Sequence, residues 1–460
     1  MAPKFGTSGL RGLVTELTDA LVDNYTRAFL TACPTGGAVH LGWDLRESSP
    51  NIAACVQNAL VAAGQTVIVH GAVPTPALAL ASMAAGQAAI MITGSHIPAD
   101  RNGLKFYIPT GEIGKDDETA IIKARTNPAI DAPGGQVIQA GDTAITAYAE
   151  RYIRAFGADA LQGQHIGVYQ HSSVARDVLC TVLQGLGAKV QPIGRSQTFV
   201  PVDTEAVDPV TRTQFIAWCD TYGLDALVST DGDADRPMVC DATGTVIPGD
   251  VLGVLTASFI GARTVCTPVS SNSMVTDIFE TVRKTRIGSP YVIAAMEDEI
   301  DADGVVGFEA NGGFLLGWNA KGPAGPLQAL MTRDCLLPIL APLAAARASD
   351  QNLARLVATL PERFTAADRL QGIPSATSQS LIRALSSDSK ARAQRFDMHG
   401  EETEVDTTDG LRMTFSSGVV IHLRPSGNAP ELRCYAEART PAAAQALVAQ
   451  TLEMLHSGLS

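Results

Sequence analysis

The fold is decided by residues 66–92, TVIVHGAVPTPALALASMAAGQAAIMI. Residues 66–69 have the β-branched composition of a buried strand, residues 76–84 have a helical pattern, and residues 88–92 form a second apolar strand. A helix between two buried strands is typical of parallel α/β architecture. This stretch therefore predicts an α/β fold.

The alternation of strands and helices continues along the chain until the C-terminal part, where the pattern changes. Further strands are predicted at 166–169, 189–190 and 225–228, and a helix at 175–186. Near the C-terminus, polarity alternates on both sides of Ser416-Ser417-Gly418, which predicts a β-hairpin, and a helix follows at 441–455. We therefore expect four domains, at 1–145, 146–247, 248–362 and 363–460.

Composition and charge exclude several classes of protein. Of the 460 residues, 46% are hydrophobic and 18% are charged, which is ordinary for a soluble globular enzyme. The formal net charge of −13 disfavours a nucleic-acid or anionic-membrane partner, because both would be repelled. The chain begins without the apolar segment of a signal peptide, and its eight cysteines are scattered, as expected for reduced thiols. We expect a cytoplasmic protein.

Four segments combine an apolar strand with a following loop rich in glycine and polar residues. The first loop is TGSHIPADRNGLK, residues 93–105, which follows the strand at 88–92. We expect its glycine turn to expose the hydroxyl of Ser95, with His96 beside it, and Asn102-Gly103 to form a turn before Lys105. A serine hydroxyl becomes a nucleophile only beside a base or a metal. Taken alone, this pattern is also typical of an ordinary capping serine.

The second loop carries three carboxylates at alternating positions. Asp231, Asp233 and Asp235 are separated by the small residues Gly232 and Ala234, so the backbone can fold to bring their oxygens together. Hard divalent cations such as Mg²⁺ prefer such oxygen ligands. An EF-hand is excluded because the twelfth loop position holds no Glu. The loop therefore predicts a metal site rather than a solvated acidic patch.

The third and fourth loops contain groups suited to a sugar and a phosphate. Glu309 and Asn311 supply a carboxylate and an amide that can hydrogen-bond hydroxyls, although a plain turn explains the same residues equally well. Residues 424–433, RPSGNAPELR, combine two arginines with a hydroxyl, an amide and backbone N–H groups. Arginine binds a phosphate dianion through two hydrogen bonds, whereas the alternative is a hairpin loop with surface arginines.

Nucleotide-binding motifs are not matched. Residues 111–116, GEIGKD, are too short for G-x-x-x-x-G-K-[ST], and Asp116 stands where Ser or Thr is required. Residues 6–12, GTSGLRG, do not fit G-x-G-x-x-G and follow no predicted strand. A nucleotide is therefore not the expected ligand.

In their order and spacing, the four loops and the N-terminal FGTSGLRG at 5–12 resemble the motifs of the α-D-phosphohexomutase family over essentially the whole chain. The resemblance implies four domains around a central cleft: three related α/β domains with mixed sheets, and a smaller α+β C-terminal domain. It also implies an isomerase that interconverts hexose 1-phosphates and hexose 6-phosphates through a phosphoserine and a hexose 1,6-bisphosphate, which would also act as activator.

The resemblance assigns roles to single residues of this sequence. Ser95 would be phosphorylated and would bind Mg²⁺ together with Asp231, Asp233 and Asp235. Proton transfer and charge stabilisation would fall to Arg11, His96 and Lys105, with Arg236 beside the metal loop. The groups that would contact the substrate are Glu309 and Asn311 at the sugar, and Arg424, Ser426, Gly427, Asn428 and Arg433 at the phosphate that does not react.

Two of the loops depart from the family's common pattern. Asn311 replaces a frequent Ser, Gly313 stands where a His is often found, and Asn428-Ala429 replaces a frequent Thr-Glu. Residues 309–313, EANGG, are most similar to bacterial members that act on mannose phosphates, so we expect a phosphomannomutase with possible phosphoglucomutase activity. The alternatives are a glucosamine phosphate as substrate, a metal-dependent sugar phosphatase, or an inactive sugar-phosphate-binding regulator. The partners expected are small hexose phosphates, and the protein is expected to be a monomer or a small homo-oligomer.

Overall fold

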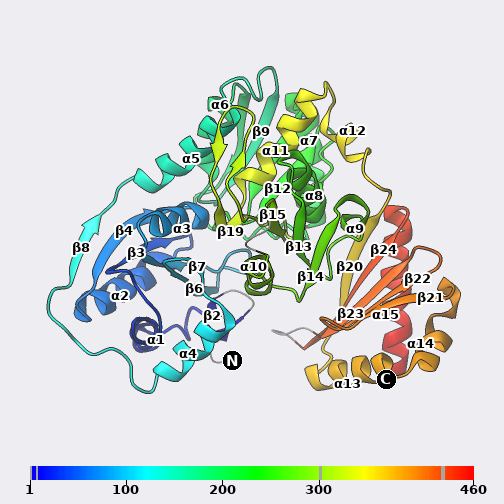
Figure 1. The fold of residues 1–460 in the computed structure, drawn as a ribbon, viewed down its shortest axis with the longest axis horizontal. Coiled ribbons are helices and arrows are strands. Elements are labelled where there is room, and N and C mark those ends of the chain that lie inside the picture. The colour runs from blue at the N-terminus through cyan, green and yellow to red at the C-terminus, as the bar shows by residue number, and fades with distance from the viewer. Residues whose placement is uncertain (1–2, 7–8, 300–302, 426–429, 460) are drawn as a thin grey trace. The chain divides into compact units, whose positions relative to one another are not determined.

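The computed structural model describes residues 3–6, 9–299, 303–425 and 430–459 (Figure 1). It divides into two compact units. Unit 1 comprises Met1–Thr264 and Gly288–Val357, and unit 2 comprises Val265–Ile287 and Ala358–Ser460. The α/β class predicted from the sequence is confirmed.

The first sheet of unit 1 has eight strands in the order β1-β2-β6-β5-β3-β4-β8, with β7 paired to β6. The strands from β5 to β8 in this order are parallel, whereas β6, β2 and β1 add antiparallel, so the sheet is mixed. Its strands are β1 (Lys4–Phe5), β2 (Leu10–Leu13), β3 (Ala38–Trp43), β4 (Thr66–Ala72), β5 (Ala88–Ile92), β6 (Arg101–Ile108), β7 (Gly111–Glu112) and β8 (Gln136–Gln139).

Four helices accompany this sheet: α1 (Asp19–Ala32), α2 (Ser49–Ala62), α3 (Thr75–Ala84) and α4 (Lys115–Ala124). Helix α1 begins where the Thr18 hydroxyl accepts a hydrogen bond from the Leu21 N–H. Helix α2 places Ile52, Val56 and Leu60 on one buried face at helical spacing. These faces pack into the core formed by the central strands, which leaves the loops at the strand ends available for the site.

The second sheet has the order β10-β9-β11-β12, with β9 parallel to both β10 and β11 and with β12 antiparallel. Its strands are β9 (His165–His171), β10 (Lys189–Arg195), β11 (Ala226–Thr230) and β12 (Pro237–Asp241). The neighbouring helices are α5 (Thr143–Phe156), α6 (Arg176–Gly185) and α7 (Pro209–Tyr222). Each strand and helix predicted for this region from the sequence is present.

The last part of unit 1 contains the antiparallel strands β15, β16 and β19 and a small hairpin of β17 and β18. The strands are β15 (Val305–Phe308), β16 (Phe314–Leu316), β17 (Ala320–Lys321), β18 (Pro326–Leu327) and β19 (Leu330–Asp334). The helices are α8 (Gly249–Phe259), α10 (Ser289–Glu297), α11 (Leu336–Ala348) and α12 (Leu353–Val357). Helix α11 is almost wholly buried, as its apolar sequence requires.

Unit 2 contains an antiparallel sheet of five strands in the order β20-β24-β23-β22-β21. The hairpin predicted around Ser416-Ser417-Gly418 is formed by β22 and β23. The elements are β13 (Thr264–Pro268), which enters unit 2 at Val265, α9 (Val275–Ile278), β14 (Thr281–Thr285), β20 (Phe364–Gln371), α13 (Ser375–Ser387), α14 (Ser389–Phe396), the 3₁₀ helix η1 (Asp397–His399), β21 (Glu402–Asp406), β22 (Leu411–Phe415), β23 (Val420–Pro425), β24 (Glu431–Ala438) and α15 (Pro441–Leu459).

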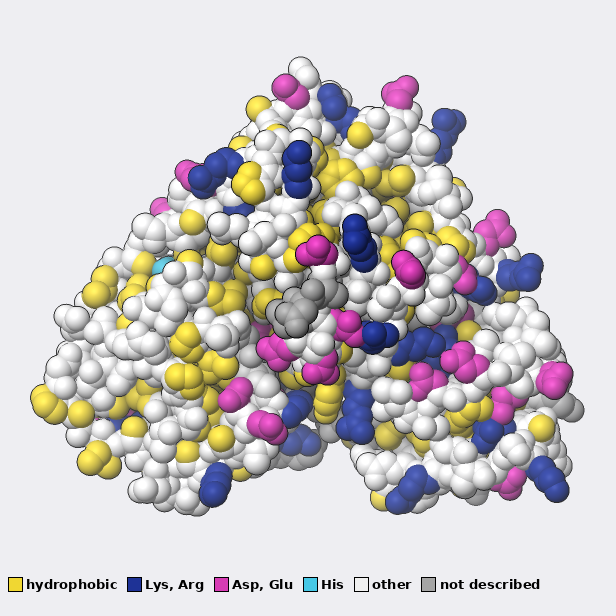
Figure 2. Space-filling view, in the orientation of Figure 1, with side chains coloured by type: hydrophobic (Ala, Val, Ile, Leu, Met, Phe, Trp, Pro, Cys, Tyr) yellow, Lys and Arg dark blue, Asp and Glu magenta, His cyan; other side chains and the backbone are white. Residues whose placement is uncertain are grey.

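On the face drawn in Figure 2, acidic and basic side chains are interspersed among uncharged surface. Within the described part of the chain, no helix combines the length and the apolar character needed to cross a bilayer.

One buried carboxylate ties β19 to two helices. Asp334 is 2% exposed and accepts hydrogen bonds from the hydroxyls of Tyr148 and Tyr152 on α5. It also accepts the N–H groups of Leu336 and Leu337 at the start of α11, each at 3.1 Å. Burial, together with the Asp334 carboxylate, raises the pKa of both tyrosines well above the ordinary range, so they remain donors. Asp334 thereby satisfies four buried donors at once.

We predict that Asp334→Ala lowers the free energy of unfolding by about 3 kcal/mol, because it leaves several buried donors without an acceptor. Asp220→Ala, at an exposed position of α7, is the matched control and should change stability by less than about 0.5 kcal/mol. Urea unfolding followed by circular dichroism measures both. Equal midpoints for the two variants would contradict the role given to Asp334.

Candidate active site

The loop after β5 presents Ser95 to the acidic loop after β11. Ser95 has a φ of 54°, a left-handed conformation that non-glycine residues seldom adopt. Its hydroxyl donates to Asp231 Oδ2 at 2.5 Å. The Nδ1 atom of the next residue, His96, lies 3.4 Å from the same hydroxyl oxygen. The expectation that the glycine turn exposes this hydroxyl is wrong. Ser95 is 1% exposed, because the acidic loop covers it.

Arg46, in the loop between β3 and α2, fixes the Ser95 loop through hydrogen bonds to its backbone carbonyls. Its Nη2 donates to the carbonyls of Ser95 at 2.9 Å and Ile97 at 2.6 Å, and its Nη1 donates to those of Pro98 at 2.8 Å and Arg101 at 3.0 Å. Its Nε donates to Asp44 at 3.1 Å. The planar guanidinium therefore fixes four successive parts of the loop at once.

Gly94 is needed for this arrangement, because a Cβ at that position would lie 2.7 Å from the Arg46 guanidinium carbon. Phe199, which follows β10, lies on the Arg46 guanidinium, with its ring centroid 3.9 Å from the guanidinium carbon. Sequence analysis missed Arg46. The only signal was an arginine within DLRES, residues 44–48, and no metal or phosphate motif includes it.

The three carboxylates of the acidic loop converge, as their spacing predicts. Asp231, Asp233 and Asp235 are fully buried, and their candidate ligand atoms lie within 4.8 Å of one another. Ala234 has a φ of 63°, and this left-handed residue turns the backbone between the last two carboxylates. The Thr75 hydroxyl at the start of α3 donates to Asp233 Oδ2 at 2.7 Å, which fixes the loop against the first sheet.

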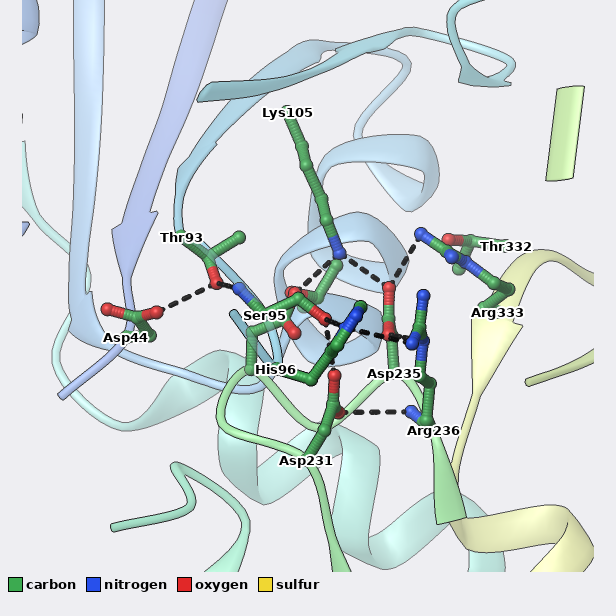
Figure 3. A network of polar contacts seen from close by, with 12 residues as sticks. Asp44, Thr93, Ser95, His96, Lys105, Asp231, Asp235, Arg236, Thr332 and Arg333 are labelled. Atoms are coloured by element: carbon green, nitrogen blue, oxygen red, sulfur yellow. Dashed lines mark hydrogen bonds and ion pairs between the residues drawn. The ribbon is translucent and has the colours of Figure 1, made fainter. Parts of the chain in front are cut away.

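Lys105 on β6 neutralises two of these carboxylates. Its Nζ lies 2.5 Å from both Asp233 Oδ2 and Asp235 Oδ2, and its side chain is 4% exposed (Figure 3). The turn expected at Asn102-Gly103 is not formed, because both residues lie inside β6. The buried Asn102 amide donates to the hydroxyls of Ser48 and Ser49, which keeps the strand extended to Lys105.

Two more cations and a neutral histidine surround the acidic loop. Arg236 donates from its backbone N–H to Asp231 Oδ1 at 3.3 Å and from Nη1 to His96 Nδ1 at 2.8 Å. Burial and the charges of Arg236 and Arg11 lower the pKa of His96 far below its ordinary value, so the ring is neutral. Burial and Arg236 lower the pKa of Arg11, on β2, to about 10, so Arg11 remains a cation at neutral pH.

The three carboxylates differ in their affinity for protons. Burial raises the pKa of Asp231 well above the ordinary carboxyl range, and the charges of Asp233 and Asp235 act in the same direction. Burial also raises the pKa of Asp233 and Asp235, but Lys105 overcomes this effect for Asp233 and Arg333 for Asp235, so both values fall below the ordinary one. Asp231 is therefore the carboxylate of the three that most readily accepts a proton.

The acidic loop fits a divalent cation. Beyond the three converging carboxylates, Asp233 Oδ1 and Asp235 Oδ1 are buried and accept no hydrogen bond from the described residues. A buried carboxylate oxygen without a donor is costly, and a bound cation would satisfy it. The donor set consists only of carboxylate oxygens, which is the chemistry that Mg²⁺ prefers.

Glu309 and Asn311 lie in the loop between β15 and β16, and they are 4% and 6% exposed. Asn311 Oδ1 accepts the Gly313 N–H at 3.0 Å, and its backbone carbonyl accepts the Thr204 hydroxyl at 3.1 Å. Glu309 Oε2 lies 3.6 Å from Nη1 of Arg333 on β19. The structure thus places this loop near the acidic loop through a residue that sequence analysis did not single out.

Arg333 joins the acidic loop to the loop of Glu309. Its Nη2 lies 2.7 Å from Asp235 Oδ2, and its side chain is 3% exposed (Figure 3). The only signal in the sequence is a charged Arg333-Asp334 pair within the apolar stretch 330–348. A charged pair within an apolar stretch predicts that both side chains are buried and paired with other polar groups. The partners of Arg333, however, lie far away in the sequence.

Two of the predicted phosphate-binding residues are described, and they lie in unit 2. Arg424 and Arg433 face each other across β23 and β24. Arg424 Nε lies 3.0 Å from Asp409 Oδ1, and Arg433 Nη2 lies 3.5 Å from Glu431 Oε2. These acidic partners reduce the repulsion between two like charges that are directly opposite. The other predicted residues of this loop, Ser426, Gly427 and Asn428, lie outside the described residues.

Comparison with protein families gives four successive matches. Models of phosphoglucomutase/phosphomannomutase match as alpha/beta/alpha domain I at residues 2–130, domain II at 146–244 and domain III at 248–364, and as the C-terminal domain at 374–454.

Individual relatives agree with these matches. The chain is 45% identical to a phosphomannomutase of Sinorhizobium fredii over 474 aligned residues, which cover 100% of both proteins. It is 43% identical to a phosphomannomutase of Salmonella muenchen, with 99% of this chain and 96% of that protein covered. A solved structure of a phosphoglucomutase/phosphomannomutase family protein from Burkholderia thailandensis matches with a TM-score of 0.78 at 20% identity and covers 98% of this chain and 97% of that one. This last match bears on the fold.

We predict that Arg46→Lys lowers the free energy of unfolding by about 3 kcal/mol, because one ammonium cannot replace the bonds of a buried guanidinium to four carbonyls. Arg101→Lys, at the exposed first residue of β6, is the control and should leave stability unchanged. Thermal unfolding followed by calorimetry distinguishes them. If Arg46→Lys unfolded at the temperature of the control, the guanidinium would not be what holds the loop.

Proposed function

The chain belongs to the phosphoglucomutase/phosphomannomutase family, and we propose that it is an isomerase that interconverts mannose 1-phosphate and mannose 6-phosphate. The observation that carries the proposal is the buried contact of the Ser95 hydroxyl with Asp231, within a cluster that contains Lys105. The 45% identity to a phosphomannomutase along the full chain supports mannose phosphates as substrates, with glucose phosphates as a second class.

In the proposed cycle, phosphorylated Ser95 transfers its phosphoryl group to the free hydroxyl of a hexose monophosphate. The bond from phosphorus to Ser95 Oγ breaks and a bond to the sugar oxygen forms, while the sugar hydroxyl loses its proton and the released Ser95 Oγ takes one up. We propose that Arg11, His96 and Lys105 together serve proton transfer and charge stabilisation at this hydroxyl; His96 is neutral, and its Nδ1 lies 3.4 Å from Ser95 Oγ and 2.8 Å from Arg236 Nη1. A phosphate dianion on Ser95 would raise the basicity of this ring.

The resulting bisphosphate turns end for end, and its other phosphoryl group returns to Ser95. In this return step the bond from phosphorus to the sugar oxygen breaks and a bond to Ser95 Oγ forms. The Ser95 hydroxyl, which donates to Asp231 Oδ2 at 2.5 Å, loses its proton, and the released sugar oxygen takes one up. Lys105, Arg236 and Arg11 supply positive charge to the transferring group, which needs positioning and charge neutralisation more than covalent help. A hexose 1,6-bisphosphate would also load Ser95 and so activate the enzyme.

We propose Mg²⁺ as the cofactor, held by Asp231, Asp233, Asp235 and the phosphate on Ser95. A bound Mg²⁺ would supply charge stabilisation to the phosphoryl oxygens. Glu309 and Asn311 would contact the sugar hydroxyls. Arg424, Ser426, Gly427, Asn428 and Arg433 would bind the phosphate that does not react.

The proposal also covers the domain boundaries, the cellular location, the partners and the oligomeric state. We propose domain boundaries near residues 145, 247 and 362. The eight free cysteines support a cytoplasmic location, since reducing compartments keep thiols unpaired. Hexose phosphates are the proposed partners, without nucleic acid or membrane, and the protein would be a monomer or a small homo-oligomer.

The proposal predicts the outcome of phosphorus NMR with Mg²⁺ and a trace of glucose 1,6-bisphosphate. Mannose 1-phosphate should be converted to the 6-phosphate, whereas Ser95→Ala should lose this activity by at least about 10³-fold because it removes the phosphoryl acceptor. Ser349→Ala, at an exposed helix end, is the control. Release of inorganic phosphate alone would overturn the mutase proposal in favour of a phosphatase, and no change at all would overturn it in favour of an inactive sugar-phosphate binder.

Removal of metal should abolish activity without unfolding the protein. Lys105 lies 2.5 Å from Asp233 Oδ2 and Arg333 lies 2.7 Å from Asp235 Oδ2, so these two cations would compensate the acidic loop after chelation. We expect EDTA to stop conversion, Mg²⁺ to restore it, and the far-ultraviolet circular dichroism spectrum to stay the same throughout. Full activity in EDTA would exclude the metal role of the three aspartates.

A further inference from the structure

Asp233 and Asp235 each make their close contacts through one carboxylate oxygen. Asp233 Oδ2 accepts the Thr75 hydroxyl at 2.7 Å and lies 2.5 Å from Lys105 Nζ. Asp235 Oδ2 lies 2.5 Å from Lys105 Nζ and 2.7 Å from Arg333 Nη2 (Figure 3). The Oδ1 atoms of both aspartates are buried and accept no hydrogen bond from the residues that the structure describes. One oxygen of each carboxylate is therefore available to a cation.

The charge of Arg236 does not occupy the second oxygen of Asp235. Arg236 Nε lies 3.9 Å from Asp235 Oδ1, which is too far for a hydrogen bond. The pattern at Asp235 is therefore asymmetric, because two cations hold Oδ2 closely and the described residues give Oδ1 no donor.

Arg333 is the more rigid of the two cations that hold Asp235. Its Nε lies 3.8 Å from Glu112 Oε1, and its side chain is 3% exposed. Asp235 and Glu112 thus lie beside different nitrogens of one planar group. A planar guanidinium between two carboxylates has less freedom to rotate than the ammonium group of Lys105 at the end of its flexible stem.

Glu112 is itself held at both oxygens. Its Oε1 accepts the Thr332 hydroxyl at 3.0 Å, and its Oε2 accepts the Ser289 hydroxyl at 2.9 Å. Glu112 lies on β7 of the first sheet, whereas Thr332 precedes Arg333 on β19. The strand that carries Arg333 is thereby attached to the sheet that carries the Ser95 loop.

Gly313 leaves the space that the Arg333 stem occupies. A Cβ built on Gly313 would lie 2.9 Å from Cδ and 3.0 Å from Cγ of Arg333, and 3.1 Å from Asn311 Oδ1. Gly313 does not have the left-handed backbone that favours glycine, unlike Gly312, whose φ is 87°. The absence of a side chain at 313 therefore serves the path of Arg333 to Asp235 rather than the backbone.

We propose that Arg333 is a positioning residue for the divalent cation: it holds Asp235 by Oδ2, so that Oδ1 stays turned away from its protein partners and free for the ion. The inference rests on the proposed function only in assigning the cation to the acidic loop. Arg333 acts through Asp235 and does not itself contact the ion.

Arg333 affects cation binding in two opposite ways. Its positive charge repels a second cation, so removal of the charge alone would strengthen binding. Its hold on Asp235 favours binding, because a ligand that is already fixed loses less freedom when the ion arrives. Residues that orient metal ligands typically change metal affinity by about 10–100-fold, so the second effect should prevail.

The test measures Mg²⁺ binding directly, on the full-length protein after treatment with EDTA and desalting. Binding of Mn²⁺ is followed by electron paramagnetic resonance, and the affinity for Mg²⁺ is obtained from its displacement of Mn²⁺. Arg333→Met removes both the charge and the contact with Asp235. Gly313→Ala displaces the Arg333 stem and Thr332→Val loosens Glu112, and both of these variants leave every charge in place.

Two substitutions serve as controls. Arg154→Met removes an arginine whose side chain is 72% exposed on α5. Gly114→Ala adds a Cβ that would meet only Asp117 Oδ2, at an ordinary 3.7 Å. Thermal unfolding shows which variants fold, and we expect Gly313→Ala and Thr332→Val to do so even if Arg333→Met does not.

We expect Arg333→Met and Gly313→Ala each to weaken Mg²⁺ binding about tenfold and Thr332→Val about threefold, whereas the two controls bind as the wild type does. In Gly313→Ala the Mg²⁺ concentration for half-maximal conversion should rise by the same factor, and kcat at saturating Mg²⁺ should stay within about twofold. A merely structural role would instead lower kcat or the unfolding temperature at an unchanged Mg²⁺ requirement. Wild-type or tighter Mg²⁺ binding in the folded variants would overturn the inference.

Failure of the proposed function would be recognised separately. If the wild-type protein binds Mg²⁺ but converts no sugar phosphate in phosphorus NMR, the mutase proposal fails, and the binding measurements alone decide the role of Arg333. If the wild-type protein binds neither Mn²⁺ nor Mg²⁺, the inference is overturned together with the metal assignment, while conversion in phosphorus NMR still decides the mutase proposal.

Discussion

The site depends on the cost of burying charge. Asp231, Asp233 and Asp235 are fully buried, and three carboxylates without water would repel one another strongly unless cations lay beside them. The cations come from separate parts of the chain: Lys105 on β6, Arg333 on β19 and Arg236 in the turn directly before β12. Compensation of one acidic loop therefore brings together residues from three different sheets, those that contain β6, β12 and β19.

The position of the Ser95 hydroxyl is determined by residues to which the proposed mechanism gives no chemical role. Ser95 adopts a left-handed backbone, which costs energy for a residue with a side chain. The hydrogen bonds from Arg46 to the carbonyls of Ser95, Ile97 and Pro98 hold this conformation in place. A buried arginine is thus used for geometry rather than for charge, since its own partner Asp44 already balances it.

The loop of Glu309 likewise depends on a residue that is distant in sequence. A family position that often carries a histidine is Gly313 in this sequence, and the structure shows that the volume is not empty, because the Arg333 stem fills it from another strand. A departure from a motif can therefore be compensated by a residue distant in sequence. The sugar-binding role proposed for this loop therefore concerns the whole cluster and not five consecutive residues alone.

The sequence by itself determined the α/β class, most strands and helices, and the convergence of the aspartates at 231, 233 and 235, because these follow from periodicity and local spacing. It did not determine that Ser95 is buried, that Asn102-Gly103 continues a strand, or that Arg46, Glu112 and Arg333 belong to the site. Those features depend on contacts between residues far apart in the chain, which only the tertiary structure brings together, because burial and charge compensation are properties of the packed molecule.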